Sequence, residues 1–159
     1  MQKDVLALII KLAYCTHAIS NYLDHLLAPA GLTFQQYKIV SALQDTPSWN
    51  NDPMITKKEA KPSDLAGAVT QVSLAKHLNL DVTTICRGIS ILRKRGVVTA
   101  TRPPANQRIT LVQLTPHGAE LFAQANELLG IWAEKLQISG KLEKSVASLQ
   151  DWAALITKQ

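Results

Sequence analysis

Residues 82–119 read VTTICRGISILRKRGVVTATRPPANQRITLVQLTPHGA, and this stretch decides the fold. It contains no aspartate or glutamate, and its six cations are Arg87, Arg93, Lys94, Arg95, Arg102 and Arg108. Because the whole chain has a formal charge of only +5, the remainder is slightly acidic and the positive charge is concentrated here. A basic surface confined to one segment favours a polyanionic partner, most commonly a nucleic-acid backbone.

The first part of this region predicts two short helices joined by a tight turn. Thr70 is a plausible cap for a helix over 71–78, and Asp81 is a plausible cap for a second helix over 82–95. Gly96 follows as the expected C-terminal stop. This arrangement is the helix-turn-helix unit.

After this unit the sequence period changes to two. We expect strands over 97–101 and 108–114, joined by a proline-rich tip over 102–107. A hairpin directly after a helix-turn-helix predicts a winged helix.

The second helix has two chemically different sides. On a wheel of about 100° per residue, Ile85, Ile89 and Leu92 share one side. The opposite side carries Thr83, Arg87, Ser90 and Lys94. Arginine can donate two bonds to guanine, hydroxyls can reach base edges or phosphates, and lysine neutralises phosphate. Ile91 lies off the apolar side, and we expect it to pack against a neighbouring element.

The hairpin tip extends this surface. Arg102, Gln107 and Arg108 lie beside prolines that stiffen the turn, and an arginine-bearing tip suits a minor groove. The residues predicted to contact DNA are Thr83, Thr84, Arg87, Ser90, Lys94, Arg102, Asn106, Gln107 and Arg108.

The flanking segments predict further helices. A long amphipathic helix over 5–27 ends before Pro29 and Gly31, and Thr33 caps a helix over 34–43 with Tyr37, Val40 and Leu43 inward. Thr115 and Pro116 begin a helix that runs to Leu136, and a last helix covers 142–156. The predicted organisation is one compact unit made of N-terminal helices (1–44), a mobile insertion loop (45–69), a winged helix-turn-helix (70–114) and C-terminal helices (115–159).

Composition narrows the classes of protein. The chain has 159 residues, 47% of them hydrophobic, and shows neither a spanning segment nor a signal peptide, so we expect a cytoplasmic protein without a membrane partner. Cys15 and Cys86 form no metal motif, and we expect both to be free thiols that pack in the interior. No phosphate loop, nucleophile elbow or carboxylate pair is recognisable, so neither an enzyme nor a bound cofactor is predicted.

Five motifs together resemble the MarR family of bacterial transcriptional regulators. They are LTFQQY (32–37), SLAKHL (73–78), LRKRGVV (92–98), NQR (106–108) and LTPHG (114–118). The resemblance implies a mainly α fold with a small β-hairpin wing (α+β). It also implies a homodimer built from the first and last helices, each subunit offering a winged helix-turn-helix to half of a palindromic operator. By this resemblance Arg108 is the wing arginine, and Arg87 is an arginine common on the recognition helix.

The chain departs from the family pattern at three positions. Asn106 stands where the family usually has Asp, Ala100 replaces a frequent Arg, and Arg93 stands where Glu is typical. The loss of an Asp–Arg ion pair predicts a more loosely held wing. These departures leave open a second hypothesis, a winged-helix module that binds an acidic protein instead of an operator.

The resemblance also suggests a small ligand that relieves repression. Family members bind such ligands between the dimerisation helices and the winged helix. The candidates here for an aromatic ligand are Tyr14, His17, Asn21, Tyr37 and Lys38.

Overall fold

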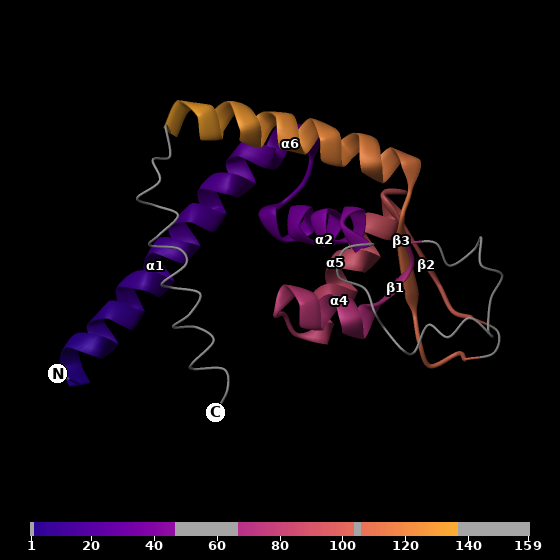
Figure 1. Ribbon diagram of the computed structural model, residues 1–159, viewed down its shortest axis with the longest axis horizontal. Coiled ribbons are helices and arrows are strands. Elements are labelled where there is room, and N and C mark those ends of the chain that lie inside the picture. The colour runs from indigo at the N-terminus through magenta and orange to yellow at the C-terminus, as the bar shows by residue number, and fades with distance from the viewer. Residues whose placement is uncertain (1, 47–66, 104–105, 137–159) are drawn as a thin grey trace. The chain divides into compact units, whose positions relative to one another are not determined.

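The computed structural model describes residues 2–46, 67–103 and 106–136 (Figure 1). The chain divides into two units, Met1–Asn126 and Glu127–Gln159. Of the second unit the structure describes only 127–136, which are helical. Most of the predicted insertion loop and the whole predicted last helix lie outside the described residues.

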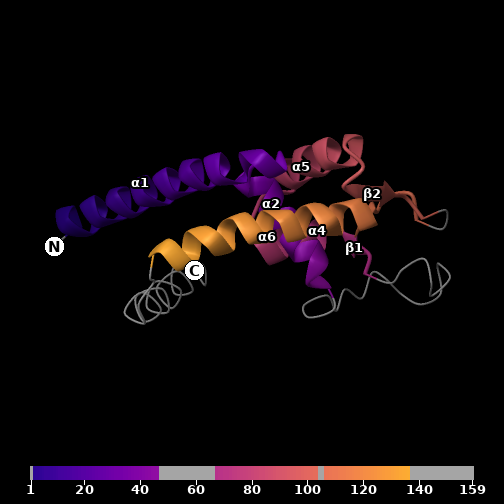
Figure 2. The same ribbon diagram turned by 90° about the horizontal axis from the view of Figure 1, so that it is seen from above.

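The N-terminal part of the first unit contains two helices. Helix α1 (Gln2–Leu27) is long and unbroken (Figure 2). A short 3-10 helix, η1 (Ala28–Ala30), follows, and Gly31 then turns the chain with φ 65°, a conformation that favours glycine. Helix α2 (Phe34–Gln44) is capped by Thr33, as predicted. The Thr33 hydroxyl accepts a bond from the Gln36 N–H at 3.2 Å, and the Gln36 side chain accepts one from the Thr33 N–H at 3.1 Å.

The predicted helix-turn-helix is confirmed. Helix α4 (Gln71–Leu78) begins after Thr70, whose hydroxyl accepts a bond from the Ser73 N–H at 3.1 Å. Asn79 makes the turn with φ 51°, and Asp81 caps helix α5 (Val82–Lys94). Helix α5 ends one residue earlier than expected, and the chain leaves it through Gly96 at φ 70°.

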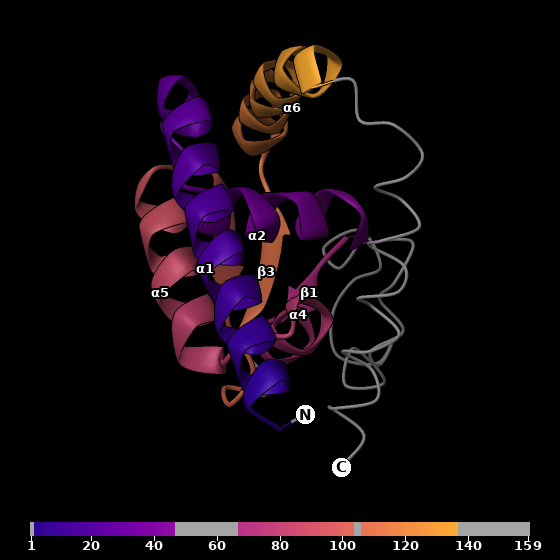
Figure 3. The same ribbon diagram turned by 90° about the vertical axis from the view of Figure 1, so that its left-hand side faces the viewer.

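The wing belongs to a three-stranded antiparallel sheet with the order β1-β3-β2 (Figure 1). Its strands are β1 (Val69–Thr70), β2 (Val98–Thr101) and β3 (Leu111–Leu114). Figure 3 shows β1 beside β3. In the β2–β3 ladder Val98 pairs with Leu114 and Thr101 with Leu111. The predicted strands over 97–101 and 108–114 were too long, because Val97 precedes β2 and residues 108–110 precede β3. Strand β1 was not predicted, since two residues are too few to show alternation.

The core of the first unit lies where α2 meets the winged helix. Helix α2 contacts α1, α4, α5 and β3, and Ile39 and Val40 are fully buried. Helix α5 approaches α2 at Gly88, where an added Cβ would lie 2.5 Å from the Ile39 Cδ1. Of the side chains predicted to point inward from α2, Val40 and Leu43 are buried and Tyr37 is half-buried.

Two packing predictions were wrong. Ile91 is 47% exposed, because it lies away from the side of α5 that faces α2. Cys15 is exposed on α1, since this segment of the long helix has no core packed over it within the described chain. Cys86 is partly buried, and its thiol donates to the Gln71 Oε1 at 3.3 Å.

The C-terminal helix begins as the sequence predicts. Helix α6 (Pro116–Leu136) follows Thr115, whose hydroxyl accepts a bond from the Gly118 N–H at 3.0 Å. Within the described ranges no helix is both long and apolar enough to span a membrane. The fold is therefore mainly α with a small antiparallel sheet, a winged helix-turn-helix, which confirms the predicted fold class.

Candidate nucleic-acid interface

Helix α5 separates its apolar and polar sides as the wheel predicts. Ile85, Ile89 and Leu92 are at most 2% exposed and anchor the helix in the core. All four side chains predicted on the opposite side are exposed, namely Thr83, Arg87, Ser90 and Lys94. The helix therefore presents hydroxyls and cations to solvent on a rigid element.

The side chain of Thr84 is hydrogen-bonded within the N-terminal cap of α5. Its hydroxyl donates to one carboxylate oxygen of Asp81, and its backbone N–H donates to the other at 2.8 Å. The hydroxyl bond, followed by the backbone bond, lowers the pKa of Asp81 below its ordinary value of 3.8. Because the Thr84 hydroxyl proton is used within the cap, Thr84 is a poorer candidate for DNA donation than Thr83.

A groove of about 390 Å³ runs between α5 and the wing, and we call it the α5–wing groove. Its lining residues are Gln71, Cys86, Ile89, Ser90, Arg93, Ala100, Arg102 and Thr110. Two predicted contacts, Ser90 of α5 and Arg102 of the wing, thus lie on one concave surface. No acidic residue lines this groove in the described part of the chain. The arrangement can hold a polyanion between helix and hairpin.

The wing turn is held by its own amides. The Asn106 Oδ1 accepts a bond from the Arg108 N–H at 3.2 Å, and the Gln107 Nε2 donates to the Pro103 carbonyl at 3.3 Å. Arg102, Gln107 and Arg108 are exposed, whereas Asn106 is half-buried. Asn106 therefore supports the turn, and the two arginines are the stronger candidates for contact.

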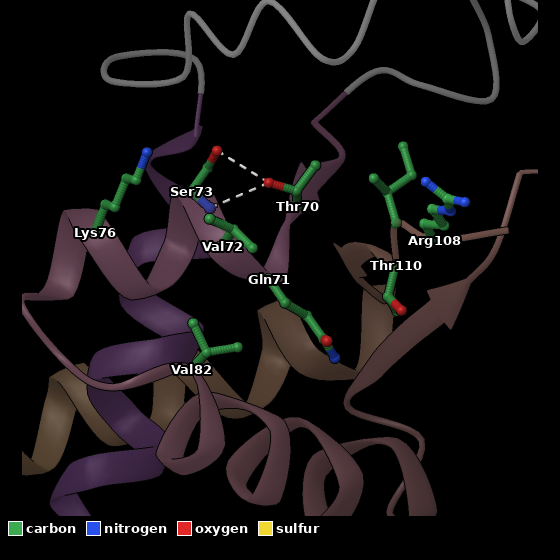
Figure 4. Close-up of a pocket in the computed structure, with 9 residues that line it drawn as sticks. Thr70, Gln71, Val72, Ser73, Lys76, Val82, Arg108 and Thr110 are labelled. Carbon is green, nitrogen blue, oxygen red and sulfur yellow. Dashed lines mark hydrogen bonds between the residues drawn. The ribbon is translucent and has the colours of Figure 1, made fainter. Parts of the chain in front are cut away.

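A second groove of about 290 Å³ separates α4 from the wing, and we call it the α4–wing groove (Figure 4). It is lined by Thr70, Gln71, Val72, Ser73, Lys76, Val82, Arg108, Ile109 and Thr110. It shares Gln71 and Thr110 with the α5–wing groove. Arg108 comes from the wing side, and Lys76 comes from α4.

The polar residues of these grooves that sequence reasoning missed include Gln71, Lys76 and Arg93. Arg93 lies about 80° from Ile85 on the wheel, so its position on the helix did not place it on the polar side. Its side chain nevertheless reaches the α5–wing groove. Lys76 and Gln71 lie on the first helix of the motif, where the only available signal was their polarity.

Arg95, one of the cations of the basic stretch, has a structural role. The Arg95 guanidinium donates to the Gly31 carbonyl at 2.5 Å, and it would also crowd a Cβ at Gly31. Arg95 therefore joins the end of the helix-turn-helix to the turn between α1 and α2. It lines neither groove.

The five ligand candidates are distributed over two helices. On α1, Tyr14 is 74% exposed, and His17 and Asn21 are hydrogen-bonded to each other at 3.2 Å. On α2, the Tyr37 hydroxyl donates to the Asn126 Oδ1 at 2.7 Å, and the Lys38 Nζ lies 5.3 Å from the centre of the Phe34 ring. None of the five lines either groove.

Tyr37 belongs to an aromatic cluster between α2 and α6. Its ring stacks on those of Phe34 and Phe122, with centroids 6.3 and 5.6 Å away. Burial, with a smaller effect from the Asp45 charge, raises the pKa of Tyr37. Tyr37 therefore has a structural role in the first unit. For metals, the described residues contain no group of three His, Cys, Asp or Glu that could hold an ion.

Comparisons with curated proteins identify transcriptional regulators, although no protein-family model matches the chain. The chain is 38% identical over 55 residues to YdgJ of Bacillus subtilis, an uncharacterised HTH-type transcriptional regulator. The matched region covers 35% of this chain and 34% of YdgJ. It is 26% identical over 108 residues to the multiple antibiotic resistance protein MarR of Salmonella typhimurium, and the match covers 68% of this chain and 61% of that protein. MarR of Escherichia coli K12 is 26% identical over 131 residues, with 80% and 77% covered. The chain thus spans less than two thirds of YdgJ and of the Salmonella protein.

Solved structures share the fold over almost the whole chain. Sco5413, a MarR family transcriptional regulator from Streptomyces coelicolor, has a TM-score of 0.73 at 16% identity, with 98% of this chain and 96% of that one covered. MosR of M. tuberculosis in complex with DNA has a TM-score of 0.66 at 20% identity, with 93% and 96% covered. BpsR of Bordetella bronchiseptica, described as regulated in its DNA binding by 6-hydroxynicotinic acid, has a TM-score of 0.63 at 17% identity, with 91% and 98% covered.

These comparisons confirm the resemblance to the MarR family and the winged-helix fold. The proteins named above are described as regulators or resistance proteins, and none is described as an enzyme, in agreement with the prediction from the sequence.

Proposed function

We propose that this chain, which resembles the MarR-family transcriptional regulators in sequence and fold, is a cytoplasmic repressor that binds a palindromic operator in duplex DNA as a homodimer. The observation that carries the proposal is the basic surface of α5 and the wing. Ser90 and Arg102 line one groove, and the exposed cations Arg87 and Lys94 lie on the same helix as Ser90. The similarity to a fold solved in complex with DNA supports it.

Each part of the surface has a distinct role in this proposal. Helix α5 lies in the major groove, where Arg87 donates to guanine and the short hydroxyls of Thr83 and Ser90 reach base edges or phosphates. The wing carries Arg102 and Arg108 towards the adjacent minor groove. The core contacts of α5 fix the helix backbone that carries Thr83, Arg87 and Ser90.

The first helix supports the homodimer. Ile10, Tyr14 and Ile19 of α1 are 61%, 74% and 54% exposed, and Ile9 and Tyr22 are 41% and 50% exposed. Large exposed apolar side chains in such number favour a protein interface. A twofold assembly would present its two α5 helices to half-sites about one helical turn apart.

A small aromatic ligand that relieves repression completes the proposal. The regulation of BpsR, a protein of the same fold, by 6-hydroxynicotinic acid supports a ligand of this class. Of the candidates, Tyr14, His17 and Asn21 are exposed on α1 and accessible in a single subunit. Tyr37 and Lys38 would first need to leave their contacts with Asn126 and Phe34.

A salt titration of DNA binding tests the proposed function. Each phosphate contact contributes about −0.9 to the slope of log K against log salt, so a steep negative slope is expected. Replacement of Arg87 by Ala should cost about 1–3 kcal/mol on the preferred operator if the residue touches a base. A flat salt response, together with recovery of an acidic protein partner, would favour the protein-interaction module instead.

A further inference from the structure

The turn between α1 and α2 is fixed by its own contacts. The Leu32 N–H donates to the Leu27 carbonyl at 3.3 Å, and both side chains are buried. The Asp24 carboxylate of α1 accepts a bond from the Phe34 N–H at 2.5 Å, which ties the start of α2 to α1. Gly31 lies between these contacts, so its carbonyl keeps a fixed position relative to the end of α1.

The exit of α5 is fixed in the same way. The Arg95 N–H donates to the Ile91 carbonyl at 3.2 Å, and the Val97 N–H donates to the Leu92 carbonyl at 2.9 Å. The side chains of Leu92 and Val97 are fully buried. The backbone of Arg95 is therefore held to the recognition helix and to the start of the wing.

A side-chain bond joins these two turns. The Arg95 Nη1 donates to the Gly31 carbonyl at 2.5 Å, across 64 positions of sequence. The Nη2 of the same guanidinium would lie 2.9 Å from a Cβ at Gly31, so the group is seated closely against the turn. Because both ends of the bond are fixed, a rotation of α5 relative to the end of α1 would break it.

The two helices joined in this way have different parts in the proposed function. Helix α1 carries the exposed apolar side chains of the proposed dimer interface, and α5 carries the exposed side chains proposed to contact DNA. In a twofold dimer the angle between these helices sets the distance between the two recognition helices. A change of one base pair between half-sites moves one of them by about 3.4 Å and about 35° around the duplex.

We propose that Arg95 is a positioning residue for operator recognition: its bond to Gly31 holds α5 at a fixed angle to α1 and thereby selects the spacing of the half-sites. The inference rests on the proposed function and assigns Arg95 no contact with DNA. On a duplex of altered spacing the recognition helices must rotate, and the bond is lost only there. The bond therefore penalises the wrong spacing and leaves the affinity for the correct spacing unchanged.

The test uses the inverted repeat selected from genomic DNA, together with versions that have one base pair inserted or deleted at its centre. Wild type, Arg95→Gln, Gly31→Ala and Arg93→Gln are titrated as full chains, and thermal melting establishes that each is folded. Gly31→Ala breaks the bond from its other end without a change of charge, because the new Cβ crowds the guanidinium and φ is 65°. Arg93→Gln is the matched control, since it removes a neighbouring cation that lines the α5–wing groove.

Arg95→Gln should reduce the preference for the selected spacing over the altered ones by about fivefold, the factor that corresponds to one ordinary hydrogen bond. Gly31→Ala should reduce it similarly. Arg93→Gln should weaken binding to all three duplexes alike and keep the preference. A general loss of stability would also affect the three duplexes alike, so the preference separates positioning from stability.

An unchanged preference in both Arg95→Gln and Gly31→Ala would overturn this inference and leave the proposed function standing. The same loss of preference in Arg93→Gln would also overturn it, because the effect would then follow from charge. A wild type that enriches no inverted repeat would overturn both the inference and the proposed function.

Discussion

Gly118 lies directly against the backbone of Val97: a Cβ at Gly118 would collide with the Val97 carbonyl oxygen and also meet the Leu114 Cδ1 at 2.6 Å. The same carbonyl accepts a hydrogen bond from the Thr115 hydroxyl at 3.0 Å, and that hydroxyl also donates to the Gly96 carbonyl at 2.7 Å. The first turn of α6 is therefore fitted to the exit of α5. This fit positions the wing relative to the recognition helix.

Gly118→Ala should destabilise the protein. The new methyl group meets backbone, which cannot move aside as a flexible side chain could, so we expect a loss of about 1–3 kcal/mol in the free energy of unfolding. Gly130→Ala is the matched control on the same helix, because no atom lies within 4 Å of its added Cβ. The control should gain up to about 1 kcal/mol from helix propensity. Chemical denaturation measures both, and equal effects would contradict the tight contact at Val97.

The cap of α5 should make stability depend on acid pH. Hydrogen bonds from Thr84 lower the pKa of Asp81 below 3.8 in the folded state, so the stabilisation is present above the ordinary pKa. It is lost as the pH falls through the lower, folded-state pKa. Asp81→Asn keeps a capping side chain and removes the charge. Denaturation between about pH 2 and pH 5 should show a shallower loss of stability for this variant than for wild type. Identical pH profiles would show that Asp81 has no such role.

Arg95 and Arg93 should respond in opposite ways to loss of charge. Arg95→Gln removes the bond to the Gly31 carbonyl and should cost on the order of 1 kcal/mol of stability while leaving the salt slope of DNA binding unchanged. Arg93→Gln removes a cation of the α5–wing groove and should make the slope shallower with little loss of stability. Melting and salt titration of both variants separate the two roles. The reverse pattern would mean that the charges are assigned wrongly.

Tyr37→Phe should destabilise the contact between α2 and α6. The variant loses the 2.7 Å bond to Asn126 and keeps the stacked ring, so the expected cost is about 0.5–1.5 kcal/mol. Tyr14→Phe removes a hydroxyl from a side chain that is 74% exposed and should change stability by less than about 0.5 kcal/mol. Denaturant midpoints measure the difference. Equal midpoints for the two variants would argue against a structural role for the Tyr37 hydroxyl.

Local signals were sufficient for most of the helical fold. Thr33, Thr70, Asp81 and Thr115 act as caps where the sequence places them, because a short polar side chain before an apolar period satisfies the first N–H groups of a helix. Strand lengths were less predictable. The start of β3 depends on where the wing turn closes, which the amide of Asn106 helps to set.

Side-chain reach and tertiary partners limited the prediction of the site. The wheel identified the exposed side of α5, yet it omitted Arg93, whose long side chain extends into the groove. The count of cations in the basic stretch included Arg95, although its partner, Gly31, is distant in the sequence. Lys76 is found on a groove only once α4 and the wing are placed beside each other.

Selection of bound fragments from genomic DNA tests the central claim most directly, that α5 and the wing together form a surface for a specific duplex. The account predicts enrichment of fragments that share an inverted repeat, with half-sites about one helical turn apart, and loss of that enrichment when Arg87 and Arg108 are both replaced by Ala. Folded wild-type protein that enriches no sequence over the input would contradict the account.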